Sequence, residues 1–205
     1  MTPIFFKRTF NITFYLLFLG SCGYILSFVI TLLEKILETI NFPPLNDLII
    51  LFENKLHLIA YASNWLSGAL IFIALFLILI EWIQRLKNDS IWNYFKSIYQ
   101  TINFRRFLRQ DETSKSVISF DNQTTVTKVN PILKAFNQIV SKCIVDVRND
   151  SVTVFIKFPR SQQAQKLLKD MEEHIKEEIS SRNPDYYFSS PSRKGNTLWF
   201  KGTRR

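Results

Sequence analysis

Glycine, cysteine and histidine are scarce in this chain, whose 205 residues include five glycines, two cysteines and two histidines. Phosphate-binding loops, disulfide frameworks and His/Cys metal sites each need several of these residues at short spacing. Cys22 and Cys143 stand far apart in the sequence. Neither His57 nor His174 has a second ligand at metal-binding spacing, and no nucleophile elbow or C-x-x-C pair occurs. We therefore expect a non-enzymatic protein with no catalytic residue, no cofactor and no bound metal.

Charge is nearly absent from two long apolar runs in the first part of the chain. Residues 10–33 read FNITFYLLFLGSCGYILSFVITLL, and residues 65–83 read WLSGALIFIALFLILIEWI with a first charge at Glu81. A membrane-spanning helix needs roughly 20 consecutive apolar residues, and an aromatic residue followed by cations is typical of its end. We therefore predict transmembrane helices over residues 10–33 and 57–83, joined by an external loop over residues 34–56.

The first run leaves two alternatives open. Leu19-Gly20-Ser21-Cys22 matches a bacterial lipobox, in which the cysteine is lipidated and the preceding residues are removed. Because apolar sequence continues without a break to Leu33, where a mature lipoprotein has a polar tether, we favour a retained span. Small residues in both runs allow close helix packing. Without a G-x-x-x-G motif, we favour packing of the two spans on each other over a homo-oligomer.

Basic residues flank the two runs unevenly. Lys7 and Arg8 precede the first run and six cations follow the second within residues 85–109, whereas two lysines lie in the connecting loop. By the positive-inside rule we predict a two-span protein of the cell membrane with both termini cytoplasmic, the N-terminal segment being residues 1–9. The net charge of +9 permits anionic lipid or nucleic acid as a partner without selecting either.

Residues 84–109 combine aromatic and basic side chains at helical spacing, with a cap at Asp89 or Ser90, and predict a basic amphipathic connector helix. This helix either lies on the anionic headgroups of the inner leaflet or packs on the soluble domain as a stalk. We favour the headgroups, because aromatic residues and cations together are typical of the membrane surface. A polar linker over residues 110–128, with a short strand at 116–120, follows. The predicted membrane-surface residues are Lys96, Arg105, Arg106 and Arg109.

A cytosolic α+β domain is predicted over residues 129–205. Its pattern has the order αββαββ, in which a four-stranded antiparallel sheet covers one face with both helices in a small sandwich. The predicted elements are a helix from Asn130-Pro131, strands over 143–148 and 151–158 across the turn Asn149-Asp150, a helix from Ser161, and strands over 185–189 and 197–201.

Cations and aromatic residues alternate near the C-terminus. Aromatic rings on a sheet surrounded by cations are typical of proteins that stack bases and neutralise phosphates. The alternative is that the rings belong to the core and the cations keep the surface soluble or face the inner leaflet. We favour this alternative, because strand alternation needs some of the rings inside. The predicted nucleic-acid or partner-binding residues are Arg193, Lys194, Lys201, Arg204, Arg205, Tyr187 and Trp199.

Two segments of the soluble part, with the two spans before them, carry a resemblance. Residues 147–158 read VRNDSVTVFIKF, residues 162–173 read QQAQKLLKDMEE, and an aromatic strand closes the domain. This layout resembles the N-terminal membrane anchor and membrane-proximal domain of FtsK/SpoIIIE-type conjugative coupling proteins of Gram-positive mobile elements. The resemblance implies a role beside a motor ATPase in conjugative or plasmid DNA transfer. The sequence has no G-x-x-x-x-G-K-[ST] loop, so we expect any motor to be a separate chain.

These patterns lead to one main hypothesis and two alternatives. The main hypothesis is a membrane-anchored adaptor or docking protein, with the lipid bilayer and a protein partner as its contacts. The first alternative is a membrane-tethered nucleic-acid-binding protein, which would bind in a salt-dependent way. The second is a membrane-acting effector or immunity protein, in which the spans themselves act.

Overall fold

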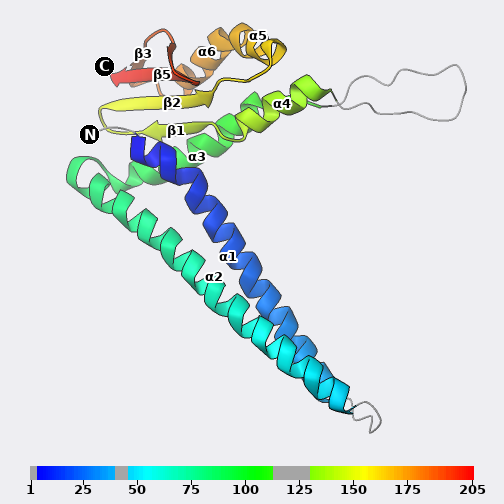
Figure 1. Cartoon of the computed structure of the whole chain (residues 1–205). Helices are drawn as coiled ribbons and strands as arrows, with labels where there is room; N and C mark the ends of the chain where they lie inside the picture. The colour runs from blue at the N-terminus through cyan, green and yellow to red at the C-terminus, as the bar shows by residue number, and fades with distance from the viewer. Residues whose placement is uncertain (1–3, 40–45, 113–129) are drawn as a thin grey trace, which may run out of the picture. The chain divides into compact units, whose positions relative to one another are not determined.

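The computed structural model of the chain describes residues 4–39, 46–112 and 130–205. The α+β class is confirmed, because two long apolar helices are followed by a small antiparallel sheet. The chain divides into two compact units (Figure 1). One unit is Arg8–Ile83, and the other joins Gln84–Arg205 with the N-terminal residues up to Lys7. The predicted strand at residues 116–120 lies outside the described residues.

The unit Arg8–Ile83 consists of most of helix α1 (Ile4–Glu38) and helix α2 (Asn46–Asn88). Both helices are long and apolar enough to cross a membrane. They are longer than predicted, and residues 46–56, which were assigned to the external loop, are helical. The physical reason is that no proline interrupts the chain between Pro44 and Pro131, so the apolar run simply extends the helix.

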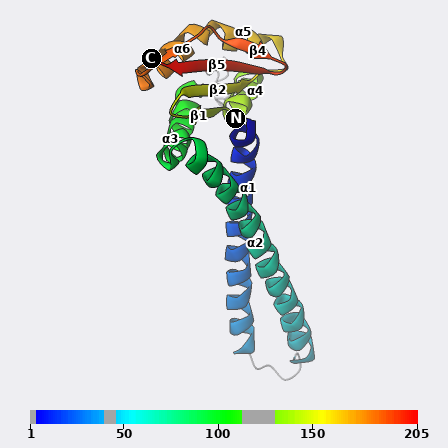
Figure 2. The same cartoon turned by 90° about the vertical axis from the view of Figure 1, so that its left-hand side faces the viewer.

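Small residues let α1 and α2 approach each other closely within this unit (Figure 2). The Ser63 hydroxyl donates a hydrogen bond to the Gly23 carbonyl at 3.0 Å, and Ser27 donates to the Ala60 carbonyl at 3.0 Å. A Cβ atom on Gly23 would lie only 2.1 Å from the Ser67 Oγ. The backbones are therefore in contact where a larger side chain would separate them.

The second unit is built around an antiparallel sheet with the strand order β1-β2-β5-β3, and β4 also pairs with β5. The helix predicted from Ser161 is two helices in the structure, and β4 was not predicted. The elements of this unit are α3 (Ile91–Leu108), α4 (Pro131–Val140), β1 (Ile144–Val147), β2 (Ser151–Lys157), α5 (Gln162–Asp170), α6 (Glu172–Arg182), β3 (Tyr186–Phe188), β4 (Ser192–Lys194) and β5 (Thr197–Arg204).

Local sequence signals set several of these boundaries. The Asn130 side chain accepts a hydrogen bond from the Ile132 N–H, and Pro131 occupies the first turn of α4. The β1–β2 hairpin turns at Asn149-Asp150. Gly195, at the β4–β5 turn, has a φ of +60°, a left-handed conformation that residues with a Cβ adopt at a cost. Capping and turn chemistry therefore fix where the elements begin and end.

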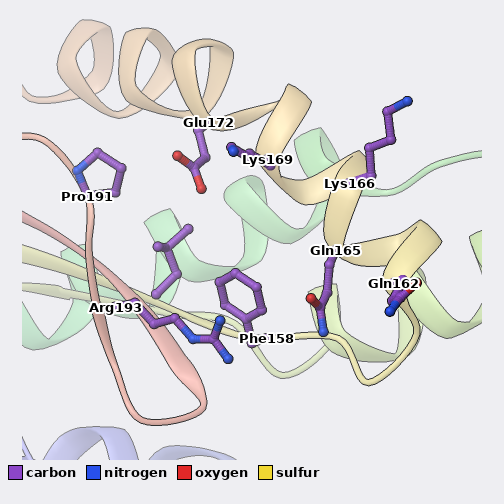
Figure 3. A pocket seen from close by; sticks show the side chains of 9 residues that line it. Phe158, Gln162, Gln165, Lys166, Lys169, Glu172, Pro191 and Arg193 are labelled. Atoms are coloured by element: carbon purple, nitrogen blue, oxygen red, sulfur yellow. The ribbon is translucent and has the colours of Figure 1, made fainter.

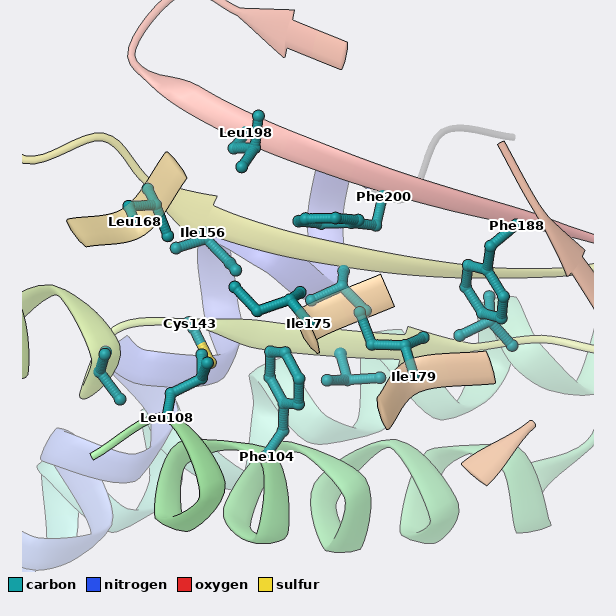
Figure 4. Packing of buried hydrophobic residues seen from close by; sticks show 14 of the residues in the cluster. Phe104, Leu108, Cys143, Ile156, Leu168, Ile175, Ile179, Phe188, Leu198 and Phe200 are labelled. Atoms are coloured by element: carbon teal, nitrogen blue, oxygen red, sulfur yellow. The ribbon is translucent and has the colours of Figure 1, made fainter. Parts of the chain in front are cut away.

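The hydrophobic core lies between one face of the sheet and the helices (Figure 4). Strand β2 contributes Val152, Val154 and Ile156, and α3 contributes Phe104 and Leu108, all of which are buried. The core therefore extends beyond the domain predicted over residues 129–205. The helix α3 belongs to the domain, because its side chains fill space that residues 129–205 leave open.

Candidate functional site

Helix α3 runs along β1, which is an edge strand of the sheet (Figure 1). The Val147 N–H donates to the Ser97 hydroxyl at 2.9 Å. The Val145 N–H donates to the Thr101 hydroxyl at 3.0 Å, and the same hydroxyl donates back to the Val145 carbonyl at 3.2 Å. An edge strand normally presents its outer backbone N–H and carbonyl groups to solvent or to another chain. In this domain, side chains of α3 satisfy them.

A third contact continues this pattern. Arg105 donates from its Nε to the Cys143 carbonyl at 2.9 Å, just before β1 begins. Ser97, Thr101 and Arg105 are four residues apart on α3, so they share one helix face. The prediction that Arg105 faces lipid headgroups does not fit this position, because its guanidinium donates a hydrogen bond to the backbone at the sheet edge.

Hydrogen bonds between two buried side-chain amides join the middle of α3 to the end of α6. Gln100 donates from Nε2 to the Asn183 Oδ1 at 2.8 Å, and Asn183 donates back from Nδ2 to the Gln100 Oε1 at 3.2 Å. Both residues are buried. Because each amide supplies a donor and an acceptor to the other, the pair satisfies polar groups that would otherwise be costly to bury.

A buried ion pair lies beside the start of α3. Arg85, at the C-terminal end of α2 and in the same unit as the sheet, has its Nη2 2.7 Å from the Asp146 Oδ1, and both side chains are fully buried. Its Nη1 donates to the Val147 carbonyl at 3.0 Å. Asp89 contacts Arg85 at 3.3 Å and accepts a hydrogen bond from the Asn149 N–H at 3.0 Å. These contacts hold the α2–α3 junction against β1 and the β1–β2 turn.

The opposite face of α3 has a different chemistry. Trp92 is 79% exposed, Tyr99 is 68% exposed and Phe95 is 49% exposed. Among the predicted membrane-surface residues, Lys96, Arg106 and Arg109 are exposed, whereas Arg105 is half-buried. We call this surface the α3 outer face, and its members are Trp92, Phe95, Lys96, Tyr99, Ile102, Arg106, Phe107 and Arg109.

Sequence reasoning missed the polar face of α3. A search for apolar periodicity selects aromatic residues such as Phe95 and Phe107, which are exposed in the structure. Ser97 and Thr101 gave the available signal, because two hydroxyl residues four apart on an otherwise aromatic and basic helix indicate a polar contact. Arg85 was read as an ordinary cation beside the second apolar run. Its burial could not be read from local sequence, since its partner Asp146 lies on a distant strand.

The predicted binding residues at the C-terminus are divided between the two faces of the sheet. Strand β5 alternates, so Trp199 and Lys201 face away from the core that Leu198 and Phe200 enter. Tyr187 pairs with Thr203 in register and is 66% exposed. By strand register, the predicted residues on the same face of the sheet as Trp199 are Tyr187, Lys194 and Lys201. Arg193 and Arg204 lie at positions of the opposite face, and Arg205 follows the last strand.

The Trp199 ring is in contact with neighbouring aromatic and basic side chains. Its ring packs edge to face against Phe155, with centroids 4.7 Å apart at 82°. The ammonium groups of Lys7 and Lys194 lie 4.9 Å and 5.0 Å from the ring centroid. These contacts occupy much of the surface that a stacked base would use, so Tyr187 is the more accessible aromatic residue on this side of the sheet.

A shallow groove lies between α5 and the β4–β5 hairpin (Figure 3). Its volume is about 540 Å³. The Arg193 guanidinium stacks 4.1 Å from the Phe158 ring centroid, and Lys166 and Lys169 line the α5 side. Glu172 supplies one acidic group in the same groove. The groove therefore has an excess of positive charge but is open to solvent.

Burial raises the pKa values of two titratable side chains in this unit, Cys143 and Tyr186. It raises the pKa of the Cys143 thiol to about 12, against a smaller lowering by Arg105. It also raises the pKa of the Tyr186 phenol, whose hydroxyl donates to the Arg148 carbonyl at 2.8 Å. Within the described ranges, no three His, Cys, Asp or Glu side chains gather as metal ligands would. Both shifted groups are held in their neutral forms at physiological pH.

Comparisons of the chain with protein-family models, with curated proteins and with solved structures find no match. They add nothing to the resemblance to coupling proteins, which rests on residues 147–158 and 162–173 and on the order of the elements.

Proposed function

We propose that this chain is a membrane-anchored protein with two spans, whose α+β domain is a cytosolic docking module. The exposure of large apolar side chains along α1 and α2 carries the proposal. Phe18, Phe28 and Phe72 are 64%, 65% and 70% exposed. Burying such a side chain contributes about 1.5–3 kcal/mol relative to leaving it in water, and a bilayer supplies that apolar environment.

The helix lengths and the flanking charges support two complete crossings. With 35 and 43 residues, α1 and α2 exceed the roughly 20 residues that span a hydrocarbon core. Their ends would therefore extend into the headgroup region. The cations that precede Phe10 and follow Ile83 outnumber those between Leu33 and Trp65, which supports cytoplasmic termini.

The docking role rests on the resemblance to conjugative coupling proteins. On that basis the domain binds a separate motor ATPase or another component of a DNA-transfer complex at the membrane. The resemblance is the support for this partner, and the anchoring proposal stands independently of it.

Membrane anchoring is tested with the full chain expressed in bacteria. We expect the protein to stay in the membrane pellet after alkaline carbonate and high salt, which remove peripheral proteins. A C-terminal green fluorescent protein should fluoresce, and a C-terminal alkaline phosphatase should be inactive. Release by carbonate would contradict the anchor, and an active phosphatase would contradict the orientation.

A second candidate function is nucleic-acid binding by the outer side of the sheet. Tyr187 is 66% exposed, and Lys201 lies on the same face of the neighbouring strand, diagonal to it across the Tyr187–Thr203 pair. An exposed ring beside a cation can stack a base and contact a phosphate.

This candidate is tested with the full chain in neutral-lipid nanodiscs and labelled single-stranded DNA at several salt concentrations. Tyr187→Ala with Lys201→Gln should weaken binding and reduce the salt slope by about one. Lys166→Gln, on α5, is the matched control and should leave the slope unchanged. DNA binding that is absent at low salt, or insensitive to salt, would remove the candidate.

A further inference from the structure

Helix α3 buries polar residues beside Phe104 and Leu108, and it exposes large aromatic residues on its other side. Its buried residues include Ser97, Gln100 and Thr101, and each makes hydrogen bonds to the rest of the domain. On the other side, Trp92 and Tyr99 are 79% and 68% exposed. In an ordinary surface helix the large aromatic residues lie in the apolar stripe toward the core, as Phe104 does here, and the outer side is polar.

The sheet edge explains the polar face but not the aromatic one. Strand β1 needs hydrogen-bonding partners along its outer edge, and the hydroxyls of α3 supply them. No requirement of the fold places a tryptophan and a tyrosine in water on the opposite side. Contiguous exposed apolar groups of this kind mark a surface that contacts something else.

The charge of α3 indicates what that contact is. Between Asp89 and Asp111 the sequence has no acidic residue, and the α3 outer face contains Lys96, Arg106 and Arg109. Asp89 itself is paired with Arg85. Aromatic residues and cations on one helix face are complementary to anionic headgroups above an acyl boundary.

The chain also brings α3 close to the end of the second apolar run. Only eight residues separate Ile83 from Trp92 in the sequence. At the roughly 3.5 Å that a fully extended residue can span, the connection cannot exceed about 32 Å. Trp92 is thus confined near any headgroup layer in which this run ends.

We infer that the α3 outer face lies on the anionic headgroups of the same bilayer that α1 and α2 cross, an inference that rests on the proposed two-span anchor. The buried polar face of α3 then fixes the sheet to a helix that is itself fixed to the membrane surface. The face of the sheet that contains Tyr187 and Lys201, and the groove between α5 and the β4–β5 hairpin, are left for a partner.

The inference is tested with the full chain in nanodiscs, using single spin labels in a Cys22→Ser background that retains the buried Cys143. Labels are placed by Tyr99→Cys on the α3 outer face, Lys166→Cys on α5 and Phe28→Cys on α1. Accessibility to oxygen, which concentrates in lipid, is compared with accessibility to a water-soluble nickel chelate. Nanodiscs contain either phosphatidylcholine alone or phosphatidylcholine with phosphatidylglycerol.

We expect the label at residue 99 to favour oxygen in the anionic nanodiscs and the label at 166 to favour the nickel chelate. A label at 99 that favours nickel in both lipids would overturn the inference while the label at 28 still reports insertion. A label at 99 that neither reagent reaches would indicate a second copy of the chain on this face and would also overturn it. A label at 28 that favours nickel would overturn the anchor, and the inference with it.

Charge variants give an independent readout. Lys96→Gln with Arg106→Gln should lower the ratio of docked to undocked label about 25-fold in anionic nanodiscs, since each cation near such a surface contributes roughly fivefold. Lys166→Gln with Lys169→Gln removes the same charge from α5 and should leave the ratio unchanged. Equal effects of the two pairs would show a general charge effect and contradict a specific α3 surface.

Discussion

The Ser97 hydroxyl accepts a hydrogen bond of 2.9 Å from the backbone N–H of Val147, which joins α3 to the edge of the sheet. Thr101 repeats the contact at Val145, four residues later on the helix and two residues earlier on the strand. Four helical residues rise about 6 Å and two strand residues advance about 6.6 Å. A helix can therefore follow a strand edge for several contacts when hydroxyl residues recur every fourth position.

We expect Thr101→Val to expose the β1 edge, because the Val145 N–H and carbonyl both lose their partner. A buried backbone group without a partner costs about 1–3 kcal/mol. Amide hydrogen exchange of the full chain in nanodiscs should show about tenfold or greater loss of protection at Val145. Ser141→Ala, at an exposed serine, is the control and should change protection little. Unchanged exchange at Val145 would show that solvent or another group satisfies this edge.

The buried pair of Arg85 and Asp146 should tolerate joint removal better than loss of one partner. Asp146→Ala removes the nearer carboxylate of the buried Arg85 guanidinium, which keeps Asp89 at 3.3 Å, and should lower the free energy of unfolding by at most about 3–5 kcal/mol. Arg85→Met with Asp146→Leu should recover part of this loss in denaturant titrations. Arg148→Ala removes the partly exposed neighbour of Asp146 and should cost less. A double variant as unstable as Asp146→Ala would contradict this account of the pair.

The contact between α1 and α2 should depend on Gly23. A Cβ there would lie 2.1 Å from the Ser67 Oγ, so Gly23→Leu should separate the helices and lower the melting temperature in detergent. Gly68→Leu adds the same side chain beside an open groove of about 450 Å³ and should have a smaller effect. Equal losses in the two variants would show that helix separation is not the cause.

The Cys143 thiol should be unreactive until the domain unfolds. Burial raises its pKa to about 12, so the thiolate that alkylating reagents require is absent at neutral pH. Because the folded pKa lies above the ordinary value of about 9, this group favours the folded state fully at lower pH. Its contribution falls as the pH rises from about 9 toward 12. Iodoacetamide labelling followed by mass spectrometry at pH 8 should modify Cys143 only after denaturant is added, and rapid labelling of the native protein would contradict its burial.

Local sequence was sufficient for the features that depend on near neighbours. The apolar runs predicted two long helices, Asn130-Pro131 predicted the start of α4, and the turn Asn149-Asp150 predicted the first hairpin. Capping, turn formation and hydrophobic periodicity involve residues within a few positions of one another, so the sequence expresses them directly.

The sequence by itself determined that this protein has a long apolar helical part and an α+β part. Tertiary structure alone decided which face of α3 is buried. Its inner side includes Ser97 and Thr101 as well as the core residues, because the strand order leaves β1 at the sheet edge and the outer backbone groups of that strand bind these two hydroxyls. Packing against β1 also buries Arg85 against Asp146 and brings the Arg105 guanidinium to the Cys143 carbonyl. Hydrogen bonds between distant segments therefore act together with the burial of Phe104 and Leu108 to select the inner face of α3, and Trp92 and Tyr99 remain exposed.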